Sequence, residues 1–149
     1  MIIKSEQDSS CDDIEVAIKY AKLNEDVQHI IALLQSFDTQ VKCNDKNTEI
    51  FVNASEIFYV ESVDKKTFIY LKDKVYHTEL RLYQLVNMLS HLGFVQVSKS
   101  CILNINVLES IKPLINSRME ATLNNGEKIH INRNYLNDIK RVLKGENER

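Results

Sequence analysis

The first third of the chain carries a helical pattern of apolar residues. From residue 12 to residue 37 the apolar positions recur at alternating spacings of four and three, which is typical of one helix face. These positions are Val16, Tyr20, Leu23, Val27, Ile30, Leu34 and Phe37. The pattern predicts a helix over 12–37 that Asp12 or Asp13 caps, and a break near Asn24 would divide it into two shorter helices.

Two roles remain open for this helix. The seam of a dimerising coiled coil is narrow and is flanked by charged residues. Here Ala17, Ile31 and Leu33 widen the apolar stripe, which favours packing against the rest of the protein or in a small helical bundle. Residues 38–48 are polar and have no periodicity, so we expect them to form a linker.

Beyond the linker the periodicity changes from that of a helix to that of strands. Short runs rich in Val, Ile, Phe, Tyr and Thr are separated by turn residues, which predicts antiparallel hairpins. We expect strands at 49–53, 56–63, 67–72, 75–78, 94–98 and 107–112. One amphipathic helix is expected among them at 79–92, ended by Gly93, and a short helix at 134–143 closes the chain.

The strongest local signal is the alternation of apolar and polar residues over 118–131. A three-residue loop, from Asn124 to Gly126, pairs Ala121 with Ile129 and keeps the apolar residues on one face. A two-residue loop would mix the two faces. The three-residue loop also places Gly126 where the chain needs a left-handed backbone, so we expect a hairpin with this loop.

These elements describe a mainly β fold with helices, in the α+β class. We expect an N-terminal helical segment over 1–46, which serves in oligomerisation or packing, and a mostly β domain over 47–149. Charge changes near the same boundary: residues 1–49 carry 5 Lys or Arg and 10 Asp or Glu, whereas residues 50–149 carry 14 and 11. This asymmetry, within a net charge of −2, is typical of a nucleic-acid or membrane face on one part of a chain.

Composition and motifs exclude several classes of protein. The sequence has no apolar run near the roughly 18 residues that a membrane span needs, and it lacks a secretory signal at its start. Three cysteines far apart favour a reducing cytosol, so we expect a cytoplasmic protein. Zinc-ligand spacings, the P-loop, GxGxxG and GxSxG are absent from the sequence, so we expect no metal, no cofactor and no enzymatic activity.

What remains is a set of basic residues at predicted turns. They are Lys65 and Lys66 beside Thr67, Lys99 between Ser98 and Ser100, and Arg133 between Asn132 and Asn134. Cations mixed with hydroxyl and amide groups donate hydrogen bonds to phosphates, and Arg or Lys also reads guanine edges in the major groove. Sequence spacing does not decide whether the three turns share one face of the molecule.

Three stretches that contain these turns resemble the LytTR family of DNA-binding domains. Residues 56–64, EIFYVESVD, are similar to the family's I-x-Y-I-E strand. Residues 94–104, FVQVSKSCILN, are similar to its F-x-R-I-x-K-S-x-I-V-N segment. Residues 123–135, LNNGEKIHINRNY, are similar to its L-x-N-G-x-x-I-x-V-S-R-x-Y ending. The resemblance covers about residues 47–144 and keeps the family's order of motifs.

The resemblance implies a fold and a function. It implies a stack of small antiparallel sheets with an inserted helix, whose loops enter neighbouring major grooves of double-stranded DNA. Carried over by motif, the DNA contacts fall at Lys65, Lys66, Thr67, Ser98, Lys99, Ser100, Asn132, Arg133 and Asn134. The family members implied are bacterial transcription regulators of a small stand-alone type that bind repeated half-sites as homodimers. The alternative is a protein-interaction module that has lost DNA binding.

Overall fold

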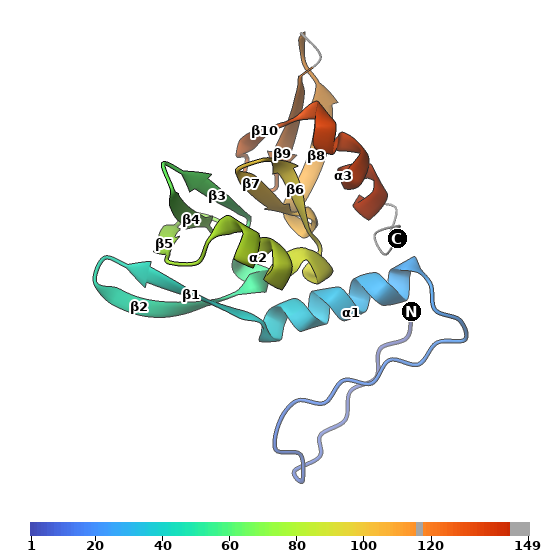
Figure 1. Cartoon of the computed structure of the whole chain (residues 1–149). Helices are drawn as coiled ribbons and strands as arrows, with labels where there is room; N and C mark the ends of the chain where they lie inside the picture. The colour runs from blue at the N-terminus through green and yellow to red at the C-terminus, as the bar shows by residue number, and fades with distance from the viewer. Residues whose placement is uncertain (116–117, 144–149) are drawn as a thin grey trace.

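The computed structural model describes residues 1–115 and 118–143 and arranges their strands in two antiparallel sheets (Figure 1). One sheet has seven strands in the order β2-β1-β5-β4-β3-β7-β6, and the other has three in the order β10-β9-β8. The strands are β1 (Gln40–Asp45), β2 (Thr48–Asn53), β3 (Tyr59–Val63), β4 (Lys66–Tyr70), β5 (Val75–Thr78), β6 (Phe94–Ser98), β7 (Cys101–Asn104), β8 (Leu108–Pro113), β9 (Met119–Leu123) and β10 (Lys128–Ile131). The α-helices are α1 (Glu25–Asp38), α2 (Leu82–Leu89) and α3 (Leu136–Leu143). The expectation of a mainly β fold with helices is confirmed.

The first helix is shorter than the sequence pattern predicts. α1 begins at Glu25, because the side chain of Asn24 accepts a hydrogen bond of 3.0 Å from the backbone N–H of Val27 and so caps the helix. The expected break near Asn24 is therefore the start of the helix. The prediction that the helix extends back to residue 12, with Asp12 or Asp13 as its cap, is wrong.

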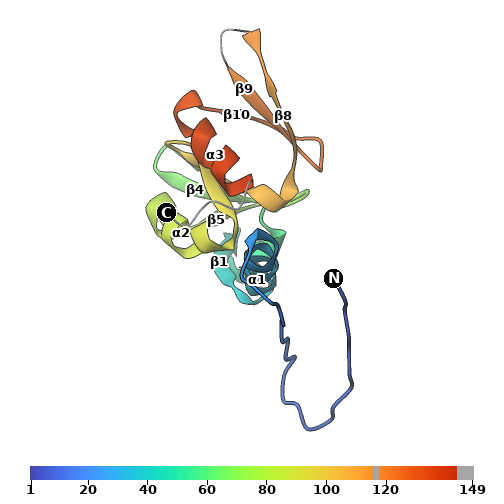
Figure 2. The same ribbon diagram turned by 90° about the vertical axis from the view of Figure 1, so that its right-hand side faces the viewer.

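Residues 1–23 form an N-terminal arm without helix or strand, which leaves the body of the molecule and turns back on itself (Figure 2). The pattern of apolar residues explains the extended backbone. Ile14, Val16, Ile18 and Tyr20 alternate with polar or small residues at a period of two, which suits an extended chain better than a helix. The apparent heptad across residues 12–37 therefore joins two segments of different structure.

The predicted linker is also wrong, because residues 40–45 form strand β1. Val41 and Cys43 point into the core and are fully buried, while Gln40 and Lys42 beside them are polar and exposed. Two inward side chains are too few to establish a period in the sequence. β1 pairs with β2 in antiparallel register. The seven-stranded sheet therefore contains residues from both sides of the domain boundary that we expect between residues 46 and 47. That boundary stays a prediction.

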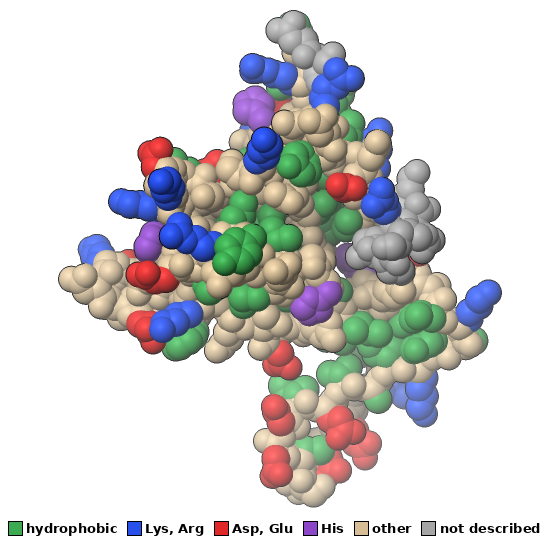
Figure 3. Space-filling model, in the orientation of Figure 1, with side chains coloured by type: hydrophobic (Ala, Val, Ile, Leu, Met, Phe, Trp, Pro, Cys, Tyr) green, Lys and Arg blue, Asp and Glu red, His purple; other side chains and the backbone are tan. Residues whose placement is uncertain are grey.

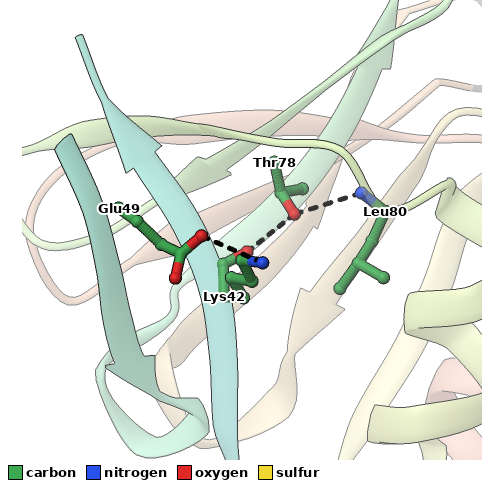
Figure 4. Close-up of polar contacts among 4 residues, drawn as sticks. All are labelled: Lys42, Glu49, Thr78 and Leu80. Carbon is green, nitrogen blue, oxygen red and sulfur yellow. Dashed lines mark hydrogen bonds and ion pairs between the residues drawn. The ribbon is translucent and has the colours of Figure 1, made fainter. Parts of the chain in front are cut away.

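A small polar cluster ties β1 to the start of α2 (Figure 4). The hydroxyl of Thr78, at the end of β5, donates to the carbonyl of Lys42 at 2.8 Å and accepts from the backbone N–H of Leu80 at 3.2 Å. Thr78 is buried, so these bonds replace the water that its hydroxyl loses. The ion pair between Lys42 and Glu49, at 2.9 Å, lies on the exposed surface and contributes little to stability.

Between β5 and β8 the chain follows the predicted order with one omission. The helix expected at 79–92 is α2 followed by one 3-10 turn at Ser90–Leu92, and Gly93 ends it with a φ of 94°. The omission is β7, whose four residues are all buried and therefore show no alternation. β7 lies between β3 and β6, so it occupies the interior of the seven-stranded sheet.

Two apolar cores hold the sheets in place. In the first, Leu85 and Leu89 of α2 pack with Val60 and Ile69 of the seven-stranded sheet. In the second, side chains from β6, β7, the three-stranded sheet and α3 pack together; it includes Val97, Leu103, Leu123 and Ile139. The second core joins the two sheets, so it determines where loops of one sheet lie relative to loops of the other.

The predicted hairpin near the C-terminus is confirmed in its register. Ala121 pairs with Ile129, and the loop Asn124–Gly126 has Gly126 at a φ of 89°. The final helix forms at Leu136–Leu143 after a 3-10 turn. Within the described ranges no helix combines the length and apolar character that a membrane span requires.

Candidate nucleic-acid interface

The first candidate loop is the turn of the β3–β4 hairpin. Val63 pairs with Lys66, which leaves Asp64 and Lys65 as the two turn residues, with φ of 51° and 66°. Positive φ at both central residues is the geometry that matches the twist of a two-residue hairpin. The guanidinium of Arg81, which precedes α2, donates to the Lys65 carbonyl at 3.2 Å and braces the turn. Lys65 and Lys66 are both exposed.

The second loop joins β6 to β7. Ser98 pairs with Cys101 after a register shift, so Lys99 and Ser100 form an exposed tip. The Ser100 backbone N–H donates to the Ser98 hydroxyl oxygen at 3.2 Å. The Ser100 carbonyl accepts from the backbone N–H of Ser62 at 2.8 Å, which ties this loop to the end of β3.

The third loop follows β10. The backbone N–H of Asn132 donates to the carbonyl of Val97 at 2.8 Å, so the loop lies beside β6. The Asn132 side chain accepts from the backbone N–H of Asn134 at 2.9 Å and holds the 3-10 turn that begins at Arg133. Arg133 is exposed at the start of this turn.

Strand pairing places the three loops side by side. β3 and β7 are antiparallel, with Glu61 opposite Cys101, so the chain leaves β3 toward residues 64–66 where it enters β7 from residues 98–100. The third loop adjoins the second through the bond to Val97. We call residues 64–66, 98–100 and 132–134 together the three-loop surface. The acidic side chains at the foot of Figure 3 lie on the N-terminal arm, away from it.

A hollow of about 860 Å³ adjoins two of the loops and separates the two sheets. Ser98, Asn132, Arg133 and Asn134 line one part of it. The hollow is open enough to admit a ridge of another molecule rather than to enclose a small one. Residues 116–117, in the β8–β9 connection, lie outside the described part of the chain and are not included in this surface.

The cations of the three-loop surface are free of acidic partners. Among the residues that the structure describes, Lys65, Lys66, Lys99 and Arg133 take part in no ion pair. An unpaired, solvated cation can exchange its counterion for a phosphate without first breaking an internal contact. The cations of this surface are therefore available to bind the phosphates of a polyanion.

Thr67 differs from the other candidates. It lies in β4, is 3% exposed and pairs with Ser62 and Thr78 on the neighbouring strands. A side chain in this position cannot reach a ligand without local unfolding, so we remove Thr67 from the expected contacts. The cause is the period of a strand, in which a shift of one residue turns a side chain from one face to the other.

Sequence reasoning missed further basic residues around the hollow. Arg118, Lys128 and His130 contribute to its lining. Lys128 is 3.6 Å from the carboxylate of Glu120, so its charge is partly neutralised inside the protein. The alternation over 118–131 places Lys128 and His130 on the polar face of the hairpin, so the sequence indicates that both side chains face outward. The position of that face beside β6 was not visible in the sequence.

Beneath the hollow, two tyrosines of the seven-stranded sheet stack on each other, and one of them bonds to the other sheet. The rings of Tyr59 and Tyr70 are 4.2 Å apart and nearly parallel. The Tyr59 hydroxyl donates to the carboxylate of Glu127 in the β9–β10 loop at 2.7 Å, and the Tyr70 hydroxyl donates to Glu61 at 3.2 Å. Burial, with the neighbouring carboxylates, raises the pKa of both phenols above the ordinary value. Both phenols therefore stay protonated donors: the bond from Tyr59 joins the two sheets, and the bond from Tyr70 lies within the seven-stranded sheet.

The remaining reactive side chain near the hollow is Cys101. Burial, together with the negative charge of Glu61, raises the pKa of this thiol to about 12. A thiol in this state is a poor nucleophile, and it packs as part of the second core. In the described ranges, no three His, Cys, Asp or Glu side chains converge as ligands for a metal ion.

Comparison with known proteins assigns this architecture to a family. The model of the LytTr DNA-binding domain family matches residues 47–144. The sensory transduction protein LytT of Bacillus cereus is 32% identical over 95 residues, which make up 64% of this chain and 39% of LytT. This chain thus spans about two fifths of the length of that relative.

Two further proteins extend the comparison. An uncharacterized HTH-type transcriptional regulator of Staphylococcus aureus is 28% identical over 131 residues, or 86% of this chain and 88% of that protein. The solved LytTr DNA-binding domain of a Bacillus cereus response regulator has the same fold, with a TM-score of 0.65 and 24% identity over 70% of this chain and 96% of that one. The family match over two thirds of the sequence confirms the resemblance of the three motifs, and the chain belongs to the LytTR family of DNA-binding domains.

Proposed function

We propose that this protein is a sequence-specific regulator of transcription that binds double-stranded DNA with its three-loop surface. The observation that carries the proposal is the meeting of three loops, each with an exposed cation without an acidic partner, at one end of β3, β6 and β7. Family membership supports DNA as the polyanion. Helix α2, by contrast, contains no Lys or Arg, which favours the loops over this helix as the binding element.

The residues have different roles in this proposal. Lys65, Lys66 and Lys99 neutralise phosphates, which contributes affinity for any sequence. Arg133 donates two parallel hydrogen bonds to a guanine edge and so contributes specificity. Ser98, Ser100, Asn132 and Asn134 donate from hydroxyl, amide or backbone groups to phosphates and hold the register of the protein on the duplex.

The test is a binding measurement on a duplex that is first selected from genomic fragments. Arg133→Ala should weaken specific binding by about 1–3 kcal/mol and relax the preference at one base pair. The matched control is Arg141→Ala, which removes the same charge from an exposed arginine of α3 that already pairs with Asp138. If both variants lose affinity equally, or neither does, Arg133 does not read a base.

The proposal includes two copies of the chain on repeated half-sites. Each three-loop surface covers one half-site, and a pair of copies then covers two sites on one side of the duplex. A duplex with both half-sites should bind more tightly than one with a single half-site at equal concentration of sites. Equal affinity for the two duplexes would exclude cooperative binding by two copies.

A further inference from the structure

The N-terminal arm carries an apolar segment whose backbone is unpaired. Ile14, Val16 and Tyr20 are 88%, 58% and 51% exposed, although all three have large hydrophobic side chains. Within the described residues, the backbone groups of residues 12–23 form no hydrogen bond to another backbone group. Exposed apolar residues on an unpaired extended segment are typical of a surface that another strand covers.

The arm faces a second apolar surface on α1. A groove of about 770 Å³ lies between them, with Ile14, Val16 and Tyr20 on the arm side and Leu34 and Phe37 on the helix side. The other side of α1 packs on the body of the protein, where Val27 is buried. Side chains of the arm and of α1 thus face the same groove from its two sides.

The charges of the arm complement those of the arm of a second copy when the two segments are antiparallel. The first half of the segment is acidic, with Asp12 and Glu15, and the second half is basic, with Lys19 and Lys22. Two copies paired antiparallel about Ala17 bring two of the three acidic residues opposite basic ones: Glu15 lies opposite Lys19 of the partner subunit, and Asp12 lies opposite Lys22 of the partner subunit. Asp13 lies opposite the small Ala21 of the partner subunit. A parallel pair would place like charges together.

The same register also matches the apolar residues. Ile14 lies opposite Tyr20 of the partner subunit and Val16 opposite Ile18 of the partner subunit, all on one face of the strand. The small side chain of Ala17 lies on the two-fold axis, where two larger side chains would crowd. The same segment of each copy thus pairs with the other and covers its apolar residues, as in any two-fold interface.

We propose that residues 12–22 form an intermolecular antiparallel strand pair, centred on Ala17, with which two copies of this chain dimerise over the groove beside α1. This inference goes beyond DNA binding, because the dimer forms without DNA. It also differs from a coiled coil through residues 12–37, since residues 14–20 form no helix and α1 contributes the apolar surface beneath them.

The first test exchanges charges in the full chain and measures the dimer dissociation constant by sedimentation velocity. Glu15→Lys should raise that constant about tenfold, because it turns two attractive cross-strand pairs into repulsive ones. Lys19→Glu should act alike, and the double variant Glu15→Lys with Lys19→Glu should restore the wild-type constant within about twofold. These side chains are exposed in the single chain, so the fold is not at risk.

The second test locates the axis by cross-linking. In a Cys11→Ser background, which removes the exposed native thiol, Ala17→Cys should form a disulfide-linked dimer on mild oxidation. The control is Ala21→Cys, an equally small exposed position whose copies would lie far from each other across the axis. Equal cross-linking at both positions, a double charge variant that fails to recover, or a wild-type chain that stays monomeric would overturn the proposal. Binding to a single half-site is measured separately and reports on the three-loop surface alone.

Discussion

The hydrogen bond from Tyr59 to Glu127 provides a measurable link between the two sheets. It joins β3 of the seven-stranded sheet to the β9–β10 loop of the other, 68 residues away along the chain. The Asn125 side chain adds a second link by donating to the carbonyl of Lys72 at 2.9 Å. Because Arg133 follows β10, these bonds help to hold it beside the loops of the first sheet. Tyr59→Phe removes the hydroxyl and keeps the ring.

The structure sets the size of the effect. A hydrogen bond to a charged group contributes about 1.5–3 kcal/mol, but Glu127 is exposed and water replaces the lost donor, so we expect about 1 kcal/mol for Tyr59→Phe. Tyr59 is 8% exposed, so Tyr59→Ala also removes the buried ring and its stack on Tyr70, which should cost about 3–5 kcal/mol.

Urea unfolding followed by far-ultraviolet circular dichroism measures both free energies of unfolding, and Tyr59→Phe should lower the melting temperature by about 2–4 °C. The reasoning fails if Tyr59→Phe is as stable as the wild type, or if it is as destabilised as Tyr59→Ala. The first result would mean that the bond contributes nothing in solution, and the second that the hydroxyl rather than the ring carries the contact.

Three further predictions concern other parts of the molecule. Gly126→Ala should lower the free energy of unfolding by about 1–2 kcal/mol from backbone strain alone, since φ is 89° and no atom lies within 4 Å of the added methyl; an unchanged urea midpoint would contradict this. Stability should fall above about pH 9, because the unfolded chain loses thiol and phenol protons there whereas Cys101 and Tyr59 retain theirs in the fold. Cys101→Ala should flatten this decline by up to about 1.4 kcal/mol per pH unit, and an unchanged slope in a pH series of urea titrations would exclude the thiol as a cause. Lys66→Ala should weaken binding to all duplex sequences alike and reduce the dependence of log K on log salt by about one unit, whereas a loss confined to the specific site would assign Lys66 to base contact.

Local patterns predicted those elements whose two faces differ. The hairpin of β9 and β10 alternates over enough residues to determine its register, and Gly126 marks the left-handed position of its loop. β1 and β7 escaped prediction for opposite reasons. β1 has only two inward apolar residues, and β7 is buried on both faces, so its sequence shows no alternation of buried and exposed positions. Strand formation in both depends on neighbours that are distant in the sequence.

The arm shows how two periods can overlap. Spacings of four and three at Val16, Tyr20 and Leu23 continue smoothly into α1, although the same stretch also alternates at a period of two from Ile14. The cap at Asn24 decides where the helix begins. A cap is a single side chain, so its signal is weaker than that of a long apolar pattern.

The candidate site was partly visible in the sequence. Turn residues identified Lys65, Lys66, Lys99 and Arg133, and all four are exposed. That their loops adjoin depends on the pairing of β3 with β7, whose residues are about 40 positions apart in the chain, and no local pattern encodes that pairing. The error at Thr67 arose at the end of a strand, where a one-residue difference in boundary exchanges the exposed and buried faces.

The central claim is that three loops contact one duplex together. Backbone amide spectra of the ¹⁵N-labelled full chain, recorded with and without a selected duplex, test it most directly. The account predicts that the largest shift changes fall within residues 64–66, 98–100 and 132–134 and saturate at the same DNA concentration. Shift changes confined to one loop, or located instead on β2 and the N-terminal arm, would contradict it.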